Sequence, residues 1–403
     1  MTASDGLMAD AKARLAALAA AEGFARVAFA AAGPLAAARA RALQAEAAGQ
    51  LAGLSWMTPA WLRRATDADT FLTGAATVMI VALPYRRAGA APNDGVARGR
   101  VAAYAAGRDY HRVFETKLRR IAATIRAEFG VGARSTVDAG TLLERPFAAQ
   151  AGLGWLGKST MLLIPGLGPW ALLGAVATKL ALEPDGPLKK SCGACTRCIA
   201  ACPTGAISPD GQLDARLCIS YHTIENRGPI PRELRPLFKD WLFGCDDCLT
   251  SCPVGATNQE SHPDLVAKSL DDAFPPLVDM LSLSEADFAA RFVGRAVARA
   301  KRDGLARNAC IVLGNTGTER DLPALVTALD HEAALVRGHA AWALARLANR
   351  LGEGHREAAK AALAARAANE HDHFARDEFE AALADLGPLE PESRTPPWPS
   401  PKS

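Results

Sequence analysis

The sequence predicts a multidomain protein of the α+β/α class, with an N-terminal α/β domain, a cysteine-rich middle domain and a C-terminal helical repeat. Helical and strand-like apolar patterns alternate over residues 1–185, which is typical of an α/β domain. Eight of the nine cysteines fall between Cys192 and Cys252, and from about residue 275 onward the patterns are only helical. A chain of 403 residues is long enough for two to four domains.

The elements of the N-terminal domain follow from its hydrophobic periodicity. Residues 7–22 predict a helix and residues 23–33 a short buried strand. Residues 76–85, rich in β-branched side chains, predict a second buried strand. Residues 135–155 predict a strand that leads into a helix and a Gly-rich turn. The intervening residues 109–129 predict a long helix with four apolar side chains on one face: Val113, Leu118, Ile121 and Ile125.

Charge and composition exclude several classes of protein. The formal net charge of +3 is too small to indicate a nucleic-acid partner by itself. The N-terminal segment carries charges throughout and lacks the pattern of a secretory signal. The uncharged stretch between Lys158 and Lys179 is broken by Pro165 and Gly168, so it predicts a strand, a turn and a strand rather than a membrane span. We therefore expect a cytoplasmic protein without a membrane partner, in which clustered thiols bind metal.

The cysteines form two runs with a spacing known from iron–sulfur proteins. The first run, C-x2-C-x2-C-x3-C-P, has the bacterial ferredoxin spacing and consists of Cys192, Cys195, Cys198 and Cys202. Together with a second run and one isolated cysteine, the total reaches the eight ligands that two [4Fe–4S] clusters need. Because the fourth cysteine of a run binds the neighbouring cluster, we expect the first cluster on Cys192, Cys195, Cys198 and Cys252. We expect the second cluster on Cys202, Cys218, Cys245 and Cys248.

Two further questions are which metal the clustered cysteines bind and what the remaining cysteine does. Zinc is the alternative metal, since paired CxxC motifs also suit tetrahedral sites, but the spacing of the first run disfavours it. Cys310 lies on the apolar face of a predicted helix, far from both runs, and is expected to be a packed core thiol.

The C-terminal part predicts a short helical repeat followed by an irregular tail. Two similar segments begin at Leu305 and Leu335, about 30 residues apart, which suggests a HEAT-like α-solenoid. The proline-rich residues 387–403 predict a disordered tail. Four arginines recur at spacings of four, four and three, which would place them on one helical face: Arg291, Arg295, Arg299 and Arg302. Such a stripe suits the phosphates of RNA, and a solvated helix face is the alternative.

Several of these motifs together resemble the epoxyqueuosine reductase family. They are YAAGRDYHRVFETKLRR, VDAGTLLERPFAAQAGLGWLGKST, the first cysteine run, LDARLCISYHTIENRGPIPRELRPL, FGCDDCLTSCP, and RNACIVLGNTG with LVRGHAAWALARL. They occur in the family's order between about residues 55 and 350. The chain departs from the family pattern after Cys252–Pro253, where Val254 and Gly255 stand in place of the usual Trp and Asn.

The resemblance implies a cobalamin-dependent oxidoreductase that removes the epoxide oxygen of epoxyqueuosine at the wobble position of tRNA, giving queuosine. With the patterns above, it implies a cobalamin-binding catalytic domain over residues 1–185. A ferredoxin-like double-cluster domain would follow over residues 186–265, and a HEAT-like tRNA-binding domain over residues 275–386. We expect a monomer that binds the anticodon stem-loop of tRNA and receives electrons from an unidentified donor.

The resemblance also assigns roles to individual residues. Asp138 matches the family's proposed proton donor, a role that needs a carboxylic acid whose pKa is raised by burial. On the residues alone, a strand end or a helix cap is the alternative for Asp138. The positions expected around the cobalamin are Arg64, Tyr104, Asp138, Lys158, Ser159, Thr160, Ser220 and Asp246. The positions expected against tRNA are Arg227, Arg295, Arg299, Arg302, Arg307 and Arg337.

Other interpretations of the same residues remain open at this point. Residues 152–159 match the letters of a phosphate-binding P-loop, but they lack a preceding strand, which disfavours nucleotide hydrolysis. Glu144 and Arg145 are expected to form an ion pair that supports the strand–helix corner. The alternative functions are a reductive dehalogenase-like enzyme with the same cofactors and an iron–sulfur subunit that only transfers electrons.

Overall fold

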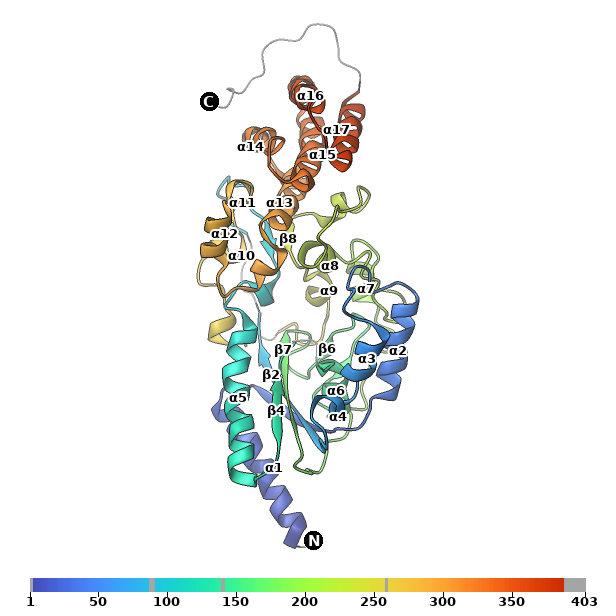
Figure 1. Ribbon diagram of the computed structural model, residues 1–403, viewed down its shortest axis with the longest axis vertical. Helices are drawn as coiled ribbons and strands as arrows, with labels where there is room; N and C mark the ends of the chain where they lie inside the picture. The colour runs from blue at the N-terminus through green and yellow to red at the C-terminus, as the bar shows by residue number, and fades with distance from the viewer. Residues whose placement is uncertain (1–2, 87–90, 139–141, 258–259, 388–403) are drawn as a thin grey trace. The chain divides into compact units, whose positions relative to one another are not determined.

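The computed structural model describes residues 3–86, 91–138, 142–257 and 260–387 (Figure 1). The chain divides into two compact units. Unit 1 comprises Met1–Ala88, Ala103–Cys218 and Asp246–Ala267, and unit 2 comprises Gly89–Ala102, Ile219–Cys245 and Lys268–Ser403. Apart from Gly387, the expected disordered tail lies outside the described residues. None of the helices in the described ranges is long and apolar enough to cross a membrane.

A four-stranded sheet forms the centre of unit 1. Its order is β1 (Arg26–Ala31), β2 (Thr77–Pro84), β7 (Ala171–Thr178) and β4 (Ala133–Thr136), and every neighbouring pair is antiparallel. All eight residues of β2 are buried, as the run of β-branched and other apolar side chains predicts. The alternation of helices and strands correctly predicts a sheet with covering helices, but it does not determine the direction of the strands.

Helices cover both faces of this sheet (Figure 1). On one face α1 (Ala3–Ala21) and α5 (Tyr110–Phe129) pack against Met79 and Val81 of β2. All four apolar side chains expected on the 109–129 helix are buried, which confirms its predicted face. On the other face α6 (Glu144–Gln150) buries Phe147 against alternate residues of the same strand. The remaining helical elements of unit 1 are α2 (Ala36–Ala47), α3 (Pro59–Ala65), α4 (Ala68–Phe71), η1 (Ala103–Ala105), α7 (Arg197–Ala201), α9 (Asp247–Thr250) and η3 (Pro263–Leu265).

The uncharged stretch after Lys158 forms a strand, a turn and a strand, as predicted. The strand β5 (Trp155–Leu156) pairs with β6 (Leu162–Leu163), and the chain then turns into β7. The turn packs closely on the segment after Cys252. A Cβ on Gly168 would lie 2.0 Å from the carbonyl oxygen of Val254, and one on Gly255 would lie 2.4 Å from the nitrogen of Gly168. Both glycines have positive φ, so Gly255, where the chain departs from the family pattern, fits a contact that larger residues would block.

Unit 2 consists mainly of helices (Figure 1). Its first part holds the parallel pair β3 (Arg100–Val101) and β8 (Trp241–Phe243), together with α8 (Ile219–Ile224) and η2 (Arg235–Phe238). The later elements are α10 (Leu270–Ala273), α11 (Leu277–Ser282), α12 (Glu285–Phe292), η4 (Ala296–Ala300), α13 (Arg302–Thr316), η5 (Glu319–Asp321), α14 (Leu322–Ala328), α15 (Ala334–Leu351), α16 (Glu353–Ala367) and α17 (His373–Leu386). The two recurring segments lie in α13 and α15, and Cys310 is fully buried in α13, as predicted.

Candidate active site

A cavity of 620 Å³ opens within unit 1 beside α3, the start of α6 and the Gly-rich turn. Part of its wall is apolar and consists of Trp56, Met57, Trp61, Leu142, Leu143, Pro146, Leu156 and Gly157. The polar wall consists of Arg41, Asp138, Glu144, Arg145, Lys158, Thr160, Asp210 and Gly211. The remaining wall belongs to the start of the first cysteine run: Ser191, Cys192 and Gly193. The motif that carries Asp138 and the first cysteine run therefore face the same space.

Asp138 is held by two side chains from different helices. Its backbone N–H donates a hydrogen bond to Oε1 of Glu144 over 2.7 Å, and the hydroxyl of Tyr110 donates to its Oδ2. The backbone of Asp138 has a φ of +36°, a conformation that residues with a side chain rarely adopt. The side chain itself is exposed and lines the cavity, so the burial expected of a proton donor is not found at Asp138. The contact with Tyr110 fixes the direction of its carboxyl group.

Tyr110 is a permanent hydrogen-bond donor to Asp138. Burial, and then the nearby Asp138 carboxylate, raise the pKa of Tyr110 far above its usual value, so the hydroxyl keeps its proton at any working pH. The Tyr110 ring, 6% exposed, packs edge-on against Tyr104 with 5.9 Å between the ring centroids. Sequence reasoning did not assign Tyr110 a role, because its contact with Asp138 spans 28 positions of the chain.

The ion pair expected between Glu144 and Arg145 is wrong. Glu144 accepts from the backbone of Asp138, whereas Nη1 of Arg145 donates to the carbonyl oxygen of Thr160 over 3.5 Å. Adjacent residues of a helix project about 100° apart, so the two side chains point to different neighbours. Desolvation, and then the charge of Asp138, raise the pKa of Glu144 from 4.5 to about 7. The cavity therefore holds a second carboxyl group that exchanges its proton near neutral pH.

The Gly-rich turn brings Lys158 and Thr160 to the cavity, while Ser159 is 7% exposed and does not line it. Nζ of Lys158 donates to the carbonyl oxygen of Gly193 over 3.0 Å, which ties the turn to the first cysteine run. Gly152 follows helix α6, and Lys158 precedes strand β6. The strand–loop–helix setting of a P-loop is thus absent from residues 142–163 of the structure, in agreement with the interpretation of the sequence.

The other positions expected around the cofactor do not line this cavity. Arg64 is exposed on α3, and Tyr104 packs between Tyr85 and Tyr110. Asp246 is 7% exposed and accepts a hydrogen bond from the backbone N–H of Ala103 over 2.8 Å. Ser220 belongs to α8 of unit 2.

Sequence reasoning missed the aromatic part of the cavity. Trp56 and Trp61 meet edge to face with 4.8 Å between their ring centroids, and Trp56 is 46% exposed. An exposed tryptophan beside a cavity is a feature of ligand-binding surfaces. The sequence holds one usable signal, since Trp56 and Trp61 lie close together in the chain. Whether either side chain is exposed, however, depends on tertiary packing.

Several thiols of unit 1 lie close enough to influence one another. Burial, and then Cys192 and Cys252, raise the pKa of Cys198, and burial with Cys192 and Cys195 also raises that of Cys252. Burial, followed by Cys218, Asp246, Cys202 and Cys198, raises the pKa of Cys248. In the part of the chain that the structure describes, no three Cys, His, Asp or Glu side chains are grouped so that they could hold a single ion.

The arginines expected on one helical face lie on separate elements, so this prediction is wrong. Arg291 lies in the last turn of α12, Arg299 lies in η4 and Arg302 begins α13. Gly294, with a φ of +69°, and Lys301, with a φ of +63°, interrupt any continuous helix. Each of the four arginines also meets a carboxylate, as in the pairs Arg291–Asp279, Arg295–Asp272, Arg299–Glu225 and Arg302–Glu285.

Arg307 is an internal anchor rather than a surface residue. Its side chain is 1% exposed and donates to the carbonyl oxygens of His222, Asn226 and Gly228. This burial corrects the expectation that Arg307 contacts tRNA. The guanidinium instead binds backbone carbonyl groups of α8 and of the loop that follows it. Arg227 of this loop is exposed and donates to backbone carbonyls, and Arg337 pairs with Glu370 over 2.6 Å.

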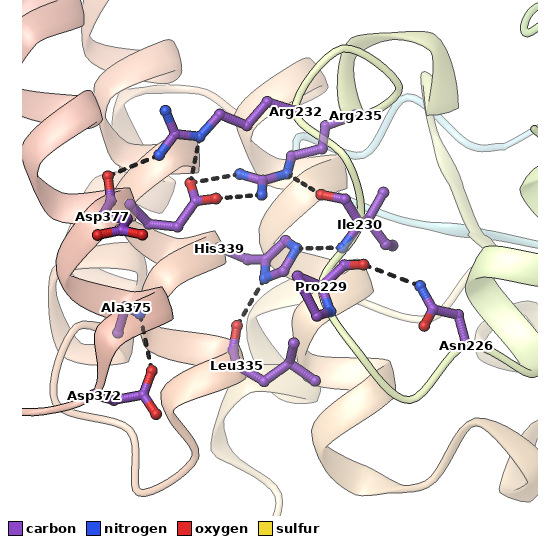
Figure 2. A network of polar contacts seen from close by, with 11 residues as sticks. Asn226, Pro229, Ile230, Arg232, Arg235, Leu335, His339, Asp372, Ala375 and Asp377 are labelled. Carbon is purple, nitrogen blue, oxygen red and sulfur yellow. Dashed lines mark hydrogen bonds and ion pairs between the residues drawn. The ribbon is translucent and has the colours of Figure 1, made fainter. Parts of the chain in front are cut away.

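A second polar network holds the same loop from the repeat helices (Figure 2). Nε2 of His339 accepts a hydrogen bond from the backbone N–H of Ile230 over 3.2 Å, and its Nδ1 lies 2.7 Å from the carbonyl oxygen of Leu335. Arg235 donates two hydrogen bonds to the carboxylate of Glu378, at 2.8 and 2.6 Å. The loop after α8 is therefore fixed within unit 2.

Three family models match separate parts of the chain. The 4Fe-4S double cluster binding domain matches residues 191–255, and the HEAT repeats model matches residues 295–384. The model described as epoxyqueuosine reductase QueG, DUF1730, matches residues 66–139. These matches confirm a double-cluster segment and a HEAT-like helical repeat, the coarse architecture expected from the sequence.

Curated relatives and solved structures agree with these models. The epoxyqueuosine reductase of Xanthomonas campestris pv. campestris is 43% identical over 62% of this chain and 70% of its own length. That of Gloeobacter violaceus is 39% identical over 70% of this chain and 91% of its own length. Two solved structures of epoxyqueuosine reductases match nearly the whole chain. One, with an epoxyqueuosine-modified tRNA-Tyr stem loop, has a TM-score of 0.86 at 28% identity and covers 94% of this chain and 99% of that chain.

The other structure, from Bacillus subtilis, has its catalytic aspartate loop swung out of the active site. It is 27% identical with a TM-score of 0.85, and it covers 95% of this chain and 100% of that chain. Family model, relatives and fold thus point to one enzyme family, with curated relatives well above 30% identity over most of their length. The chain belongs to the epoxyqueuosine reductase family.

Proposed function

We propose that this chain removes the epoxide oxygen of epoxyqueuosine in tRNA, with electrons that pass through two [4Fe–4S] clusters to a cobalamin in the cavity of unit 1. The observation that carries the proposal is the composition of this cavity. Asp138 lies in one wall, and Cys192 and Gly193 lie in another. An electron carrier and a proton donor that face one space are what a reductive deoxygenation needs.

The thiol groups support the assignment of cluster ligands. Cys192 and Cys252 act on Cys198, and Cys192 and Cys195 act on Cys252, so these four thiols are the proposed ligands of the first cluster. Cys218 and Cys202 act on Cys248, and Cys245 completes this second ligand set by the spacing rule.

The walls of the cavity suit a corrin ring in their chemistry. Its apolar wall, with Trp56, Trp61 and Leu156, suits the flat faces of the ring, and the polar wall suits the amide groups at its rim. Lys158, Thr160 and Arg41 are the residues we propose for the rim and the phosphate. Arg64, Tyr104, Ser159, Ser220 and Asp246 remain candidates by resemblance alone. When bound, cobalamin supplies a low-valent cobalt centre that attacks carbon and accepts electrons one at a time.

The residues of this chain supply position and protons. The overall reaction takes two electrons and two protons, breaks both C–O bonds of the epoxide, forms the C=C bond and releases water. Asp138 is the proposed donor to the leaving oxygen, since it lines the cavity, its carboxyl group accepts a hydrogen bond from Tyr110 and its backbone N–H is held by Glu144.

A tRNA is the proposed partner, because a relative of the same fold was solved with an epoxyqueuosine-modified stem loop. A wobble base in an unpaired loop can be splayed out and bound in a pocket. Arg227, Arg295, Arg299, Arg302 and Arg337 remain proposed contacts, and each already has partners that an RNA phosphate would have to share. The tRNA substrate would place the reaction in the cytoplasm, with a donor of electrons still to be identified.

Asp138→Asn tests the proposed reaction. The wild-type protein, reconstituted anaerobically with iron, sulfide and cobalamin and supplied with a strong reductant, should convert epoxyqueuosine in tRNA to queuosine, seen as the loss of one oxygen in the nucleoside mass. The variant should keep its iron and cobalamin and lose at least about a hundredfold in rate, the usual contribution of a general acid. Unchanged turnover would remove Asp138 from this role. Wild-type protein that leaves the epoxide intact but dehalogenates an aryl halide, or does neither, would contradict the proposed function.

A further inference from the structure

Unit 2 contains a hollow that the proposed reaction does not use. It has a volume of 350 Å³ and lies between α15 and α17, which are neighbours in the repeat (Figure 1). Its lining consists of Trp342, Arg346, Asn349, Arg350 and Asp385. Four of these residues lie within nine positions of α15, so the helix itself presents them together.

Two guanidinium groups in this hollow lack an acidic partner. Nε of Arg346 donates to Oδ1 of Asn315 over 3.0 Å, and Nη1 of Arg350 donates to the carbonyl oxygen of Gly314 over 3.3 Å. Neither arginine makes an ion pair with a carboxylate within the ranges that the structure describes. Each guanidinium has five N–H donors, so most of them remain available to a ligand.

Arg346 lies four positions before Arg350 on α15, so the two positive charges are neighbours on the helix. The guanidinium of Arg346 also lies 5.5 Å from the ring centroid of Trp342. Like charges four residues apart, as Arg346 and Arg350 are, destabilise a helix. Burial, and then the charge of Arg350, lower the pKa of Arg346. An anion in the hollow would relieve this repulsion.

The hollow differs from the arginines that the sequence pattern favours. Arg295, Arg299 and Arg302 each face a carboxylate of the chain itself, so their charge is already balanced. The acid in the lining of the hollow is Asp385, whose backbone carbonyl accepts a hydrogen bond from Nδ2 of Asn349 over 3.2 Å. Its carboxylate makes no ion pair with Arg346 or Arg350. The positive charge of the hollow is therefore left for a ligand from outside.

We propose that this hollow binds a phosphate of the tRNA backbone outside the modified nucleotide, with Arg346 and Arg350 as its ligands. Guanidinium groups bind phosphate oxygens through two parallel hydrogen bonds, and RNA offers phosphates at regular intervals along its surface. The proposal rests on the proposed tRNA substrate. It adds Arg346 and Arg350 as RNA contacts on α15, where only Arg337 is expected from the sequence to contact tRNA.

Binding of full-length tRNA to the reconstituted protein tests this site. Arg350→Gln is the main variant, because Arg350 is exposed and has one weak hydrogen bond. The affinity of this variant for tRNA should fall about fivefold near 0.15 M salt. The slope of the logarithm of the binding constant against the logarithm of the salt concentration (the salt slope) should shrink by about one, the effect of one lost phosphate contact. Arg320→Gln, which removes an exposed arginine of η5 outside the hollow, is the control for net charge and should change neither quantity. Asp385→Asn should instead strengthen binding, because it removes the carboxylate from the hollow.

Turnover separates this proposal from the proposed function. Arg350→Gln should raise KM for tRNA and leave kcat unchanged, since the hollow does not touch the reacting atoms. Wild-type turnover with equal affinities and salt slopes for wild type, Arg350→Gln and Asp385→Asn would overturn the phosphate site and leave the reductase function intact. Inorganic phosphate that binds the hollow without competing with tRNA would identify a small-anion site and would also overturn the proposal. Wild-type protein that binds no tRNA would overturn both.

Discussion

The backbone N–H of Asp138 donates a hydrogen bond to Oε1 of Glu144 over 2.7 Å, and this contact links the end of β4 to the start of α6. It stabilises the left-handed backbone of Asp138, which would otherwise cost about 1–3 kcal/mol. It also brings two carboxyl groups into one cavity, where like charges oppose each other. The geometry of the proposed proton donor thus depends on a second acid.

Glu144→Gln should change how stability depends on pH. The unfolded chain loses the Glu144 proton near pH 4.5, whereas the folded chain holds it to about pH 7. The contribution of Glu144 to the free energy of unfolding of the wild type is therefore full below pH 4.5 and declines as the pH rises to about 7. Glutamine keeps a side-chain oxygen that can accept the hydrogen bond from the backbone N–H of Asp138, but it has no proton to lose in this pH range. The Tm of the variant should rise relative to wild type between about pH 5 and pH 8.

The exposed residue Glu380 on α17 provides the control for this experiment. Glu380→Gln removes the same formal charge far along the chain and should not reproduce the pH-dependent difference. A Tm difference between Glu144→Gln and wild type that stays constant over this pH range would show that Glu144 does not hold its proton in the folded protein.

Tyr110→Phe should slow the reaction without weakening substrate binding. The variant removes the hydroxyl that donates to Oδ2 of Asp138 and leaves the ring packing against Tyr104. A hydrogen bond to a charged group contributes about 1.5–3 kcal/mol, so kcat should fall at least about tenfold while KM for tRNA stays constant. Steady-state kinetics with matched iron and cobalamin contents provide the measurement. Equal kcat values would mean that the Tyr110 hydroxyl does not position Asp138 during turnover.

Cys198→Ser should remove one cluster and spare the other. Cys198 belongs to the proposed ligand set of the first cluster, so iron and sulfide should fall to about half of the wild-type content. Cys310→Ala is the matched control, because Cys310 is fully buried in α13 and distant in sequence from both runs. It should retain the full iron content. Full iron in the Cys198 variant, or an iron loss in the Cys310 variant, would contradict the proposed assignment.

His339→Gln should reduce the sensitivity of the protein to acid. Burial, and then the charges of Arg235 and Arg307, lower the pKa of His339 well below its usual 6.5. In the unfolded chain His339 takes up a proton near pH 6.5, whereas in the folded chain it does not. The free energy of unfolding therefore has its full value above pH 6.5 and declines as the pH falls below it. Glutamine can still accept from Ile230 and donate to Leu335, the two contacts drawn in Figure 2.

Urea unfolding at about pH 5.5 and about pH 7.5 gives the measurement for His339→Gln. The loss of unfolding free energy between the two pH values should be smaller in the variant than in wild type. An identical loss in both proteins would show that His339 takes up its proton without unfolding of the loop.

Sequence periodicity predicted the parts of the fold that depend on local burial. The apolar face of α5, the strand–turn–strand after Lys158 and the core position of Cys310 all follow from the spacing of apolar residues. The spacing of the cysteines predicted a double-cluster segment, and the matching family model confirms it. These features depend on neighbours in the sequence, which a pattern can capture.

The features that the sequence could not predict depend on backbone breaks and on distant partners. The arginine pattern had helical spacing, but the left-handed backbone of Gly294 ends the helix before the pattern continues. Glu144 has its partner six residues away instead of beside it, and Tyr110 reaches Asp138 from another helix. The tryptophan wall of the cavity and the unpaired arginines of α15 likewise emerge only when separate segments pack together.

The central claim, that the cavity beside the first cysteine run holds the corrin ring, is tested most directly by cobalamin binding to Leu156→Glu. Leu156 lines the cavity and is 47% exposed, so the variant should fold and keep its iron. Val293→Glu, at a residue 70% exposed in unit 2, is the matched control. We expect wild type and Val293→Glu to retain cobalamin absorbance through gel filtration under anaerobic conditions, and Leu156→Glu to lose it. Equal retention by all three proteins, or none by wild type, would contradict the account.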